Sequence, residues 1–150
     1  NGEKNVEISG TAVFSNTKYR EKISKDDTIY LNIINNEVYN TALSYSMEDN
    51  TRISLNVVKS KTKRTVSLRN GKPVFKIMVT MNADISEISG GVGSAMQNSD
   101  IEEFKKRGEE YVEKQIKNVI STLHNRYESD ASGLARLLYI CEQDFYRENG

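Results

Sequence analysis

Residues 66–85, VSLRNGKPVFKIMVTMNADI, contain the strongest structural signal in the sequence. Within it, Asn70-Gly71 is a dipeptide that favours a two-residue turn between antiparallel strands. After the turn, apolar residues occupy every second position from Phe75 to Ile85, and mostly polar residues stand between them. A period of two is typical of a strand that buries one face. The stretch therefore predicts a β-hairpin with one face on a core.

The strand before this turn is expected to cover Arg52 to Leu68. Along it, the residues expected to face the core change from odd-numbered to even-numbered positions. A two-residue turn places Val66 opposite Phe75, so the even-numbered residues near the turn face the core. The apolar residues at the start of the strand (Ile53, Leu55 and Val57) are odd-numbered. Odd-numbered and even-numbered residues of one strand can face the same side only if the strand contains an extra residue between them. We therefore predict a β-bulge or break between Val58 and Arg64.

The segment from Ser99 to about Glu128 predicts a long helix. It opens with Ser99-Asp100-Ile101-Glu102, the pattern of a capping box, and at 1.5 Å per residue it would be about 43 Å long. Apolar residues then recur at the spacing of one helical face. They are Ile101, Phe104, Tyr111, Val112, Ile116, Val119, Ile120, Leu123 and Tyr127.

Shorter elements complete the pattern. Ser24 followed by two acids predicts a helix from about Lys25 to Asn35, and the chain stops near Ser129-Asp130 before a last helix. Two further strands are expected, one at each side of the first helix. Their core faces would carry Val6, Ile8, Ala12 and Phe14 in the first strand, and Tyr39, Leu43, Tyr45 and Met47 in the second.

These elements predict an α+β fold, in which an antiparallel sheet of about four strands packs against a long C-terminal helix plus shorter helices. A chain of 150 residues suggests a single domain, 1–150. With one cysteine, Cys141, no internal disulfide is possible. The chain starts without a methionine, so we expect it to be an excised piece of a longer protein.

Charge is balanced overall but unevenly distributed. Residues 51–83 contain eight basic residues and no acidic one, although the formal net charge of the chain is zero. Such asymmetry can mark a partner surface. We name Lys59, Lys61, Lys63 and Arg64 as a possible docking face for acidic loops or anionic lipid headgroups. The competing interpretation is a strand face that is merely solvated. Nucleic acid is not expected, because aromatic residues do not interleave with these cations.

No residue pattern predicts catalysis, a cofactor or a metal. The glycine-rich run at residues 89–94 lacks the lysine that a phosphate-binding loop needs. His124 is the only histidine and has no second ligand or nucleophile at a useful spacing. Cys141 falls in an apolar helical stripe and is expected to be a small buried residue.

Four segments, in this order, resemble the C-terminal domain of the Ger(x)C family of spore germination lipoproteins. They are Gly10-Thr11-Ala12-Val13-Phe14, the basic strand at residues 54–63, the hairpin at residues 70–77, and the helix end Tyr127-Glu128-Ser129-Asp130 with Gly133 and Leu134. The resemblance covers nearly the whole chain. The chain departs from the family in lacking the upstream domain with its lipid-modified cysteine, and the alternating strand and basic tail expected at the C-terminus. We therefore expect truncation at both ends.

The resemblance implies the non-catalytic C subunit of a spore germinant receptor. Such a subunit would be held by an upstream lipid anchor at the outer face of the inner spore membrane. Its partners would be the integral membrane A and B subunits, and its task would be docking within the receptor complex. The alternative is a small-ligand-binding domain of an extracytoplasmic lipoprotein, with a pocket between sheet and helix. A third hypothesis, a hydrolase with a dispersed site, lacks a nucleophile–base pair.

Overall fold

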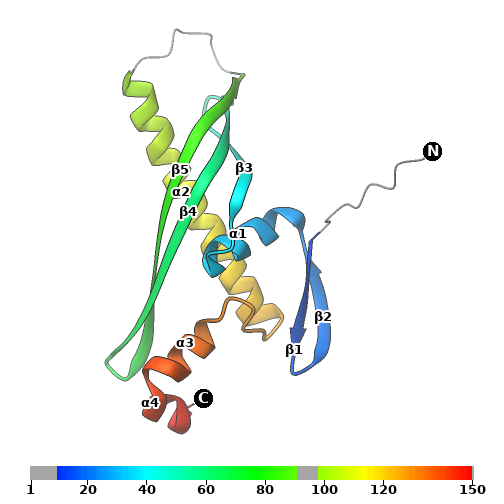
Figure 1. Cartoon of the computed structure of the whole chain (residues 1–150), viewed down its shortest axis with the longest axis vertical. Coiled ribbons are helices and arrows are strands. Elements are labelled where there is room, and N and C mark those ends of the chain that lie inside the picture. The colour runs from blue at the N-terminus through cyan, green and yellow to red at the C-terminus, as the bar shows by residue number, and fades with distance from the viewer. Residues whose placement is uncertain (1–9, 91–97, 150) are drawn as a thin grey trace, which may run out of the picture.

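The computed structural model describes residues 10–90 and 98–149. Within these residues, the elements follow one another as five strands and five helical segments (Figure 1). The strands are β1 (Thr11–Ser15), β2 (Lys18–Ile23), β3 (Tyr39–Ser46), β4 (Arg52–Arg69) and β5 (Lys72–Ser89). The helical segments are α1 (Lys25–Asn35), α2 (Asn98–Ser121), η1 (Thr122–Arg126), α3 (Leu134–Cys141) and α4 (Gln143–Asn149).

The strands form two antiparallel sheets. One has three strands in the order β3-β4-β5, and the other is the β1-β2 hairpin. The predicted α+β class is confirmed, whereas the expected sheet of about four strands is divided between two sheets. The sequence prediction also missed β2, because its residues Lys18–Ile23 are mostly exposed and carry no apolar alternation.

The long β4–β5 hairpin has the predicted turn and register. Arg69 pairs with Lys72 and Val66 with Phe75. Asn70 and Gly71 both have positive φ, at 50° and 68°, as a two-residue turn of the primed type requires. The register shifts between Val57 and Lys59. Val58 is therefore the extra residue, which confirms a bulge at the N-terminal limit of the predicted window.

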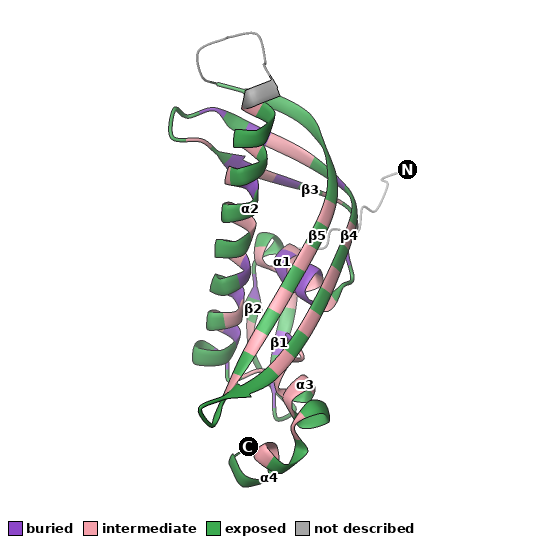
Figure 2. Cartoon of the chain, turned by 90° about the vertical axis from the view of Figure 1, so that its left-hand side faces the viewer, coloured by how far each residue is buried: buried purple, intermediate pink, exposed green. Residues whose placement is uncertain are grey.

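A second register shift lies between Ser54 and Leu55, where Ser86 of β5 has no directly paired residue on β4. The sequence prediction did not include it. Because each bulge increases the local twist of a strand, the two together help the hairpin to curve. Figure 2 shows the curved hairpin standing beside α2, with α1 behind both.

The long helix is confirmed as α2 continued by η1. At η1 the hydrogen bonds widen to the π pattern, with the Tyr127 N–H donating to the Thr122 carbonyl oxygen. Leu123 and Tyr127 are both buried there. Gly108 is buried against the ring of Tyr45, where an added Cβ would lie 3.2 Å from Tyr45 Cε1. Glycine thus lets α2 approach β3 closely.

The core lies where α1, the second half of α2 and the sheet meet. Ile33 and Ile34 of α1, Val57 of β4, and Val119 of α2 belong to one buried cluster. Helix α1 has the predicted bounds, and the Ser24 side chain accepts a hydrogen bond from the Asp27 N–H as its N-cap. No helix within the described residues is long and apolar enough to cross a membrane.

The predicted core face of the first strand was wrong. Val13 and Ser15 are buried, whereas Ala12 and Phe14 are exposed; Val6 and Ile8 lie outside the described residues. The reason is that the β1–β2 hairpin packs under the end of the long helix. There the Ser15 hydroxyl donates to the Glu128 carbonyl oxygen and the Ser129 hydroxyl donates to the Phe14 carbonyl oxygen.

The burial of Tyr30 should make the folded chain less stable at alkaline pH. Burial raises the pKa of its hydroxyl well above the ordinary value of 10.0, and the interaction with Tyr111 raises this pKa further. The unfolded chain therefore releases this proton at lower pH than the folded chain does, so stability should fall as pH rises above about 10. Tyr30→Phe should flatten that fall in urea titrations at several pH values. The control is Tyr19→Phe, since Tyr19 is exposed, and an equal effect of both substitutions would contradict the assignment.

Candidate functional site

The structure places the three predicted lysines on one exposed face of the β4–β5 hairpin. Lys59, Lys61 and Lys63 are exposed and alternate with the half-buried Ser60 and Thr62. They lie on the side opposite Ile77, Val79 and Met81, which pack on the core, because successive residues of a strand face opposite sides.

Cross-strand pairing extends this face onto β5. Lys61 pairs with Thr80, Lys63 with Met78, and Arg69 with Lys72, and directly paired residues share a face. The basic face therefore holds six of the eight cations of residues 51–83: Lys59, Lys61, Lys63, Arg69, Lys72 and Lys76. All six are exposed, and no ion pair found among the described residues involves them.

Sequence reasoning missed the contribution of β5 to the basic face. Lys72 and Lys76 were counted among the eight cations but were not assigned to the docking face. The register implied by Asn70-Gly71 carried the missing signal, because it pairs Lys76 with Thr65 on the side that carries Lys63. The same register, used for the charged residues as well as for the apolar ones, would have placed Lys72 and Lys76 on this face.

Arg64 does not lie on the basic face. It occupies the opposite, core-facing side of β4 and is half-buried. Its guanidinium Nη1 donates to the Ser132 carbonyl oxygen at 2.6 Å and to Asn35 Oδ1 at 3.3 Å. Gly133 is close enough that an added Cβ would lie 3.2 Å from the same nitrogen. Arg64 therefore joins β4 to α1 and to the turn before α3.

An apolar groove of about 1200 Å³ separates α2 from the sheet. Its position matches the pocket between sheet and helix that the small-ligand alternative requires. The apolar part of its lining comes mainly from one side of β5 and one side of α2. These residues include Phe75, Ile77, Val79, Met81, Ile85, Ile101, Phe104, Val112, Ile116 and Ile120.

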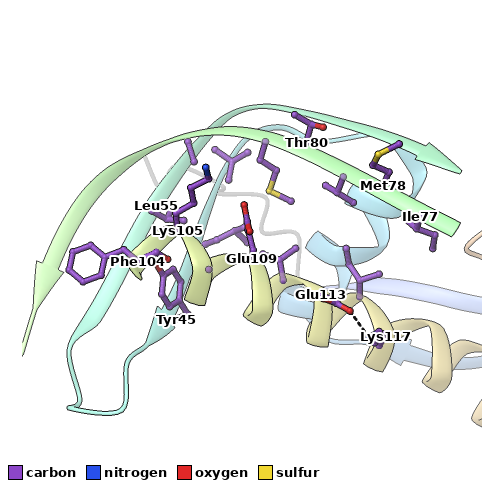
Figure 3. Close-up of a pocket in the computed structure, with 18 of the residues that line it drawn as sticks. Tyr45, Leu55, Ile77, Met78, Thr80, Phe104, Lys105, Glu109, Glu113 and Lys117 are labelled. Carbon is purple, nitrogen blue, oxygen red and sulfur yellow. Dashed lines mark hydrogen bonds and ion pairs between the residues drawn. The ribbon is translucent and has the colours of Figure 1, made fainter. Parts of the chain in front are cut away.

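Charged side chains stand among the lining of this groove. Lys105 and Glu109 project from α2 toward the space under the arched strands, whereas the Glu113 carboxylate turns along the helix toward Lys117 (Figure 3). Glu113 is paired with Lys117 one turn further along the helix, and this pairing lowers the pKa of the Glu113 carboxyl. The groove thus combines an apolar floor with charges of both signs, and β5 borders it as an edge strand of the three-stranded sheet.

The two residues considered for catalysis are both at the surface. His124 lies in η1 and is exposed. Cys141 is exposed at the end of α3, so the prediction of a buried cysteine was wrong. Its helix has no fully buried residue and leaves part of its apolar stripe open to solvent. The described residues hold no cluster of three or more histidine, cysteine or acidic side chains that could bind a metal.

Comparison with known proteins gives consistent matches. The family described as "Spore germination B3/ GerAC like, C-terminal" matches residues 9–149. Spore germination protein B3 of Bacillus subtilis (strain 168) is 27% identical over 96 residues, which cover 64% of this chain and 26% of that protein. The crystal structure of the GerBC protein superposes with a TM-score of 0.80 at 21% identity, covering 99% of this chain and 46% of that one.

The chain therefore spans less than half the length of the relatives that it matches. Within that part, the fold agrees with the solved relative over nearly every residue. The family match begins at the first strand and ends in the last helix, so it includes the hairpin, the long helix and the turn held by Arg64. The chain belongs to the spore germination B3/GerAC-like family and carries its C-terminal region.

Proposed function

We propose that this chain is the C-terminal domain of the non-catalytic C subunit of a spore germinant receptor. In this role it acts in nutrient-triggered germination by docking within a membrane-associated complex. Its partners are the integral membrane A and B subunits, and a lipid anchor upstream of this chain holds it at the outer face of the inner spore membrane. Family membership supports the role in germination.

The observation that carries the docking proposal is the basic face of the β4–β5 hairpin. Six cations project from one side of two paired strands, and all are exposed. A surface of one charge sign attracts a partner of the opposite sign and orients it. The competing interpretation, a solvated strand face, predicts that these cations can be replaced without consequence. The exposed positions of His124 and Cys141 offer no comparable support for catalysis.

Spores that lack the full-length protein test the proposed role in germination. We expect them to lose the response to at least one class of nutrient and to regain it when the gene is restored. A gene carrying His124→Gln should restore the response equally well, because no catalytic role is assigned to this side chain. Normal germination of the deletion strain with every nutrient tested would contradict the role, and failure of His124→Gln at normal protein levels would favour an enzyme or ligand site.

The groove between α2 and the sheet favours a second candidate function, a small-ligand-binding domain. Ligand sites are concave and mostly apolar, with a few polar groups that orient the ligand, and this groove has that composition. A thermal-shift screen of amino acids, sugars, nucleosides and apolar compounds separates the candidates. A ligand whose effect is abolished by Val112→Arg, a substitution in the groove lining, would support binding. No shift with any compound would leave docking as the function.

A further inference from the structure

Apolar side chains are interspersed among the cations of the basic face. Lys72, Val74, Lys76 and Met78 follow one another at every second position of β5 and so share one side of it. Val74 is 39% exposed and Met78 is 49% exposed. Cationic and apolar side chains therefore alternate along the exposed side of β5.

Strand β4 flanks this row with more cations. Lys63 pairs directly with Met78, and Lys61 and Lys59 continue the same side of β4. Val58, the bulge residue next to Lys59, is also exposed. Lys59 and Arg69 are ten positions apart, which corresponds to about 33 Å of extended strand. Residues 59–82 contain no acidic residue, so this length of the hairpin carries no opposing charge of its own.

We propose that the basic face binds the surface of an anionic lipid bilayer, an inference that rests on the proposed docking role of this face. Ammonium and guanidinium groups would meet the lipid phosphates, and the side chains of Val74 and Met78 would enter the boundary between headgroups and acyl chains. Surfaces that bind membranes combine both kinds of residue, and each basic residue near such a surface strengthens binding about fivefold. Beneath its anionic headgroups a bilayer offers a continuous apolar layer to Val74 and Met78, which a purely acidic protein surface does not.

Sedimentation with lipid vesicles tests the proposal. The purified chain should sediment with vesicles of equal parts phosphatidylcholine and phosphatidylglycerol, but not with pure phosphatidylcholine, and added salt should weaken binding. Changing Lys59, Lys61 and Lys63 together to Glu should weaken binding at least about 100-fold. The control changes Lys18, Lys25 and Lys106 to Glu, which alters net charge equally at exposed positions outside the β4–β5 hairpin. Thermal melting establishes that both variants fold.

The apolar positions provide the second measurement. Met78→Ser with Val74→Ser should weaken vesicle binding several-fold while leaving net charge unchanged. The proposal is overturned if the parent chain does not bind vesicles that contain phosphatidylglycerol, or if the two triple variants bind these vesicles equally well. If vesicle binding is absent but spores carrying the triple change in the hairpin still fail to germinate, the face serves an acidic protein partner and the docking role stands. If the triple change in the hairpin abolishes vesicle binding but spores carrying it germinate normally, the docking role itself fails.

Discussion

Replacing Ile116 with aspartate should unfold the domain or nearly so. Ile116 is 7% exposed and belongs to the buried cluster that joins α2, α1 and the sheet. The substitution places a carboxylate in this cluster, whose other members are all hydrophobic. The expected cost is several kcal/mol against a total stability of about 5–15 kcal/mol. Ile116→Ala, which only creates a cavity, should cost about 2–5 kcal/mol.

The matched control is Lys114→Asp, two residues away on the exposed side of the same helix. It introduces the same side chain into α2 without burying it, so it should cost less than about 1 kcal/mol. Urea titrations followed by circular dichroism measure both. Equal destabilisation by the two substitutions would mean that α2 presents a different side to the core.

Arg64→Met should also lower the free energy of unfolding, although by less than Ile116→Asp. Methionine keeps much of the apolar stem but removes both hydrogen bonds of Nη1, leaving the Ser132 carbonyl oxygen and Asn35 without this donor. Hydrogen bonds to charged groups contribute about 1.5–3 kcal/mol each, and the two share one nitrogen, so we expect a loss of about 2–3 kcal/mol. The turn before α3 should loosen, seen as faster amide hydrogen exchange at Gly133, whose N–H donates to the Asp130 carbonyl oxygen.

The adjacent residue provides the control. Lys63→Met makes the same kind of change on the exposed side of β4 and should alter stability by less than about 0.5 kcal/mol. If Arg64→Met were as mild as Lys63→Met, Arg64 would not be the link between β4 and the turn.

The hairpin was predictable because two local signals constrain it. Asn70-Gly71 determines the register, and the change of parity between Val57 and Val66 requires an extra residue in between. The bounds of α1 followed from the Ser24 cap at one end and from Asn35-Asn36 at the other, where Asn36 adopts the left-handed conformation. In each case, the deciding interactions lie within a few residues of the signal, so one sequence is enough to recognise them.

The errors arose where distant segments decide the environment. Arg64 is adjacent to the lysines in sequence, and its burial depends on distant acceptors, Ser132 and Asn35; strand alternation alone already separates it from Lys63. The core face of β1 depends on the end of the long helix, more than 100 residues away. The groove likewise depends on how far the hairpin curves over α2. Periodicity indicates which side of an element is apolar, but not whether another element covers it.

Docking through the basic face can be tested in spores whose full-length protein carries glutamate in place of Lys59, Lys61 and Lys63 and is otherwise intact. We expect these spores to respond to nutrient as poorly as spores lacking the protein, although the variant accumulates normally. Spores with the control change at Lys18, Lys25 and Lys106 should respond like the parent. Normal germination by the hairpin variant, at normal protein levels, would contradict docking through this face.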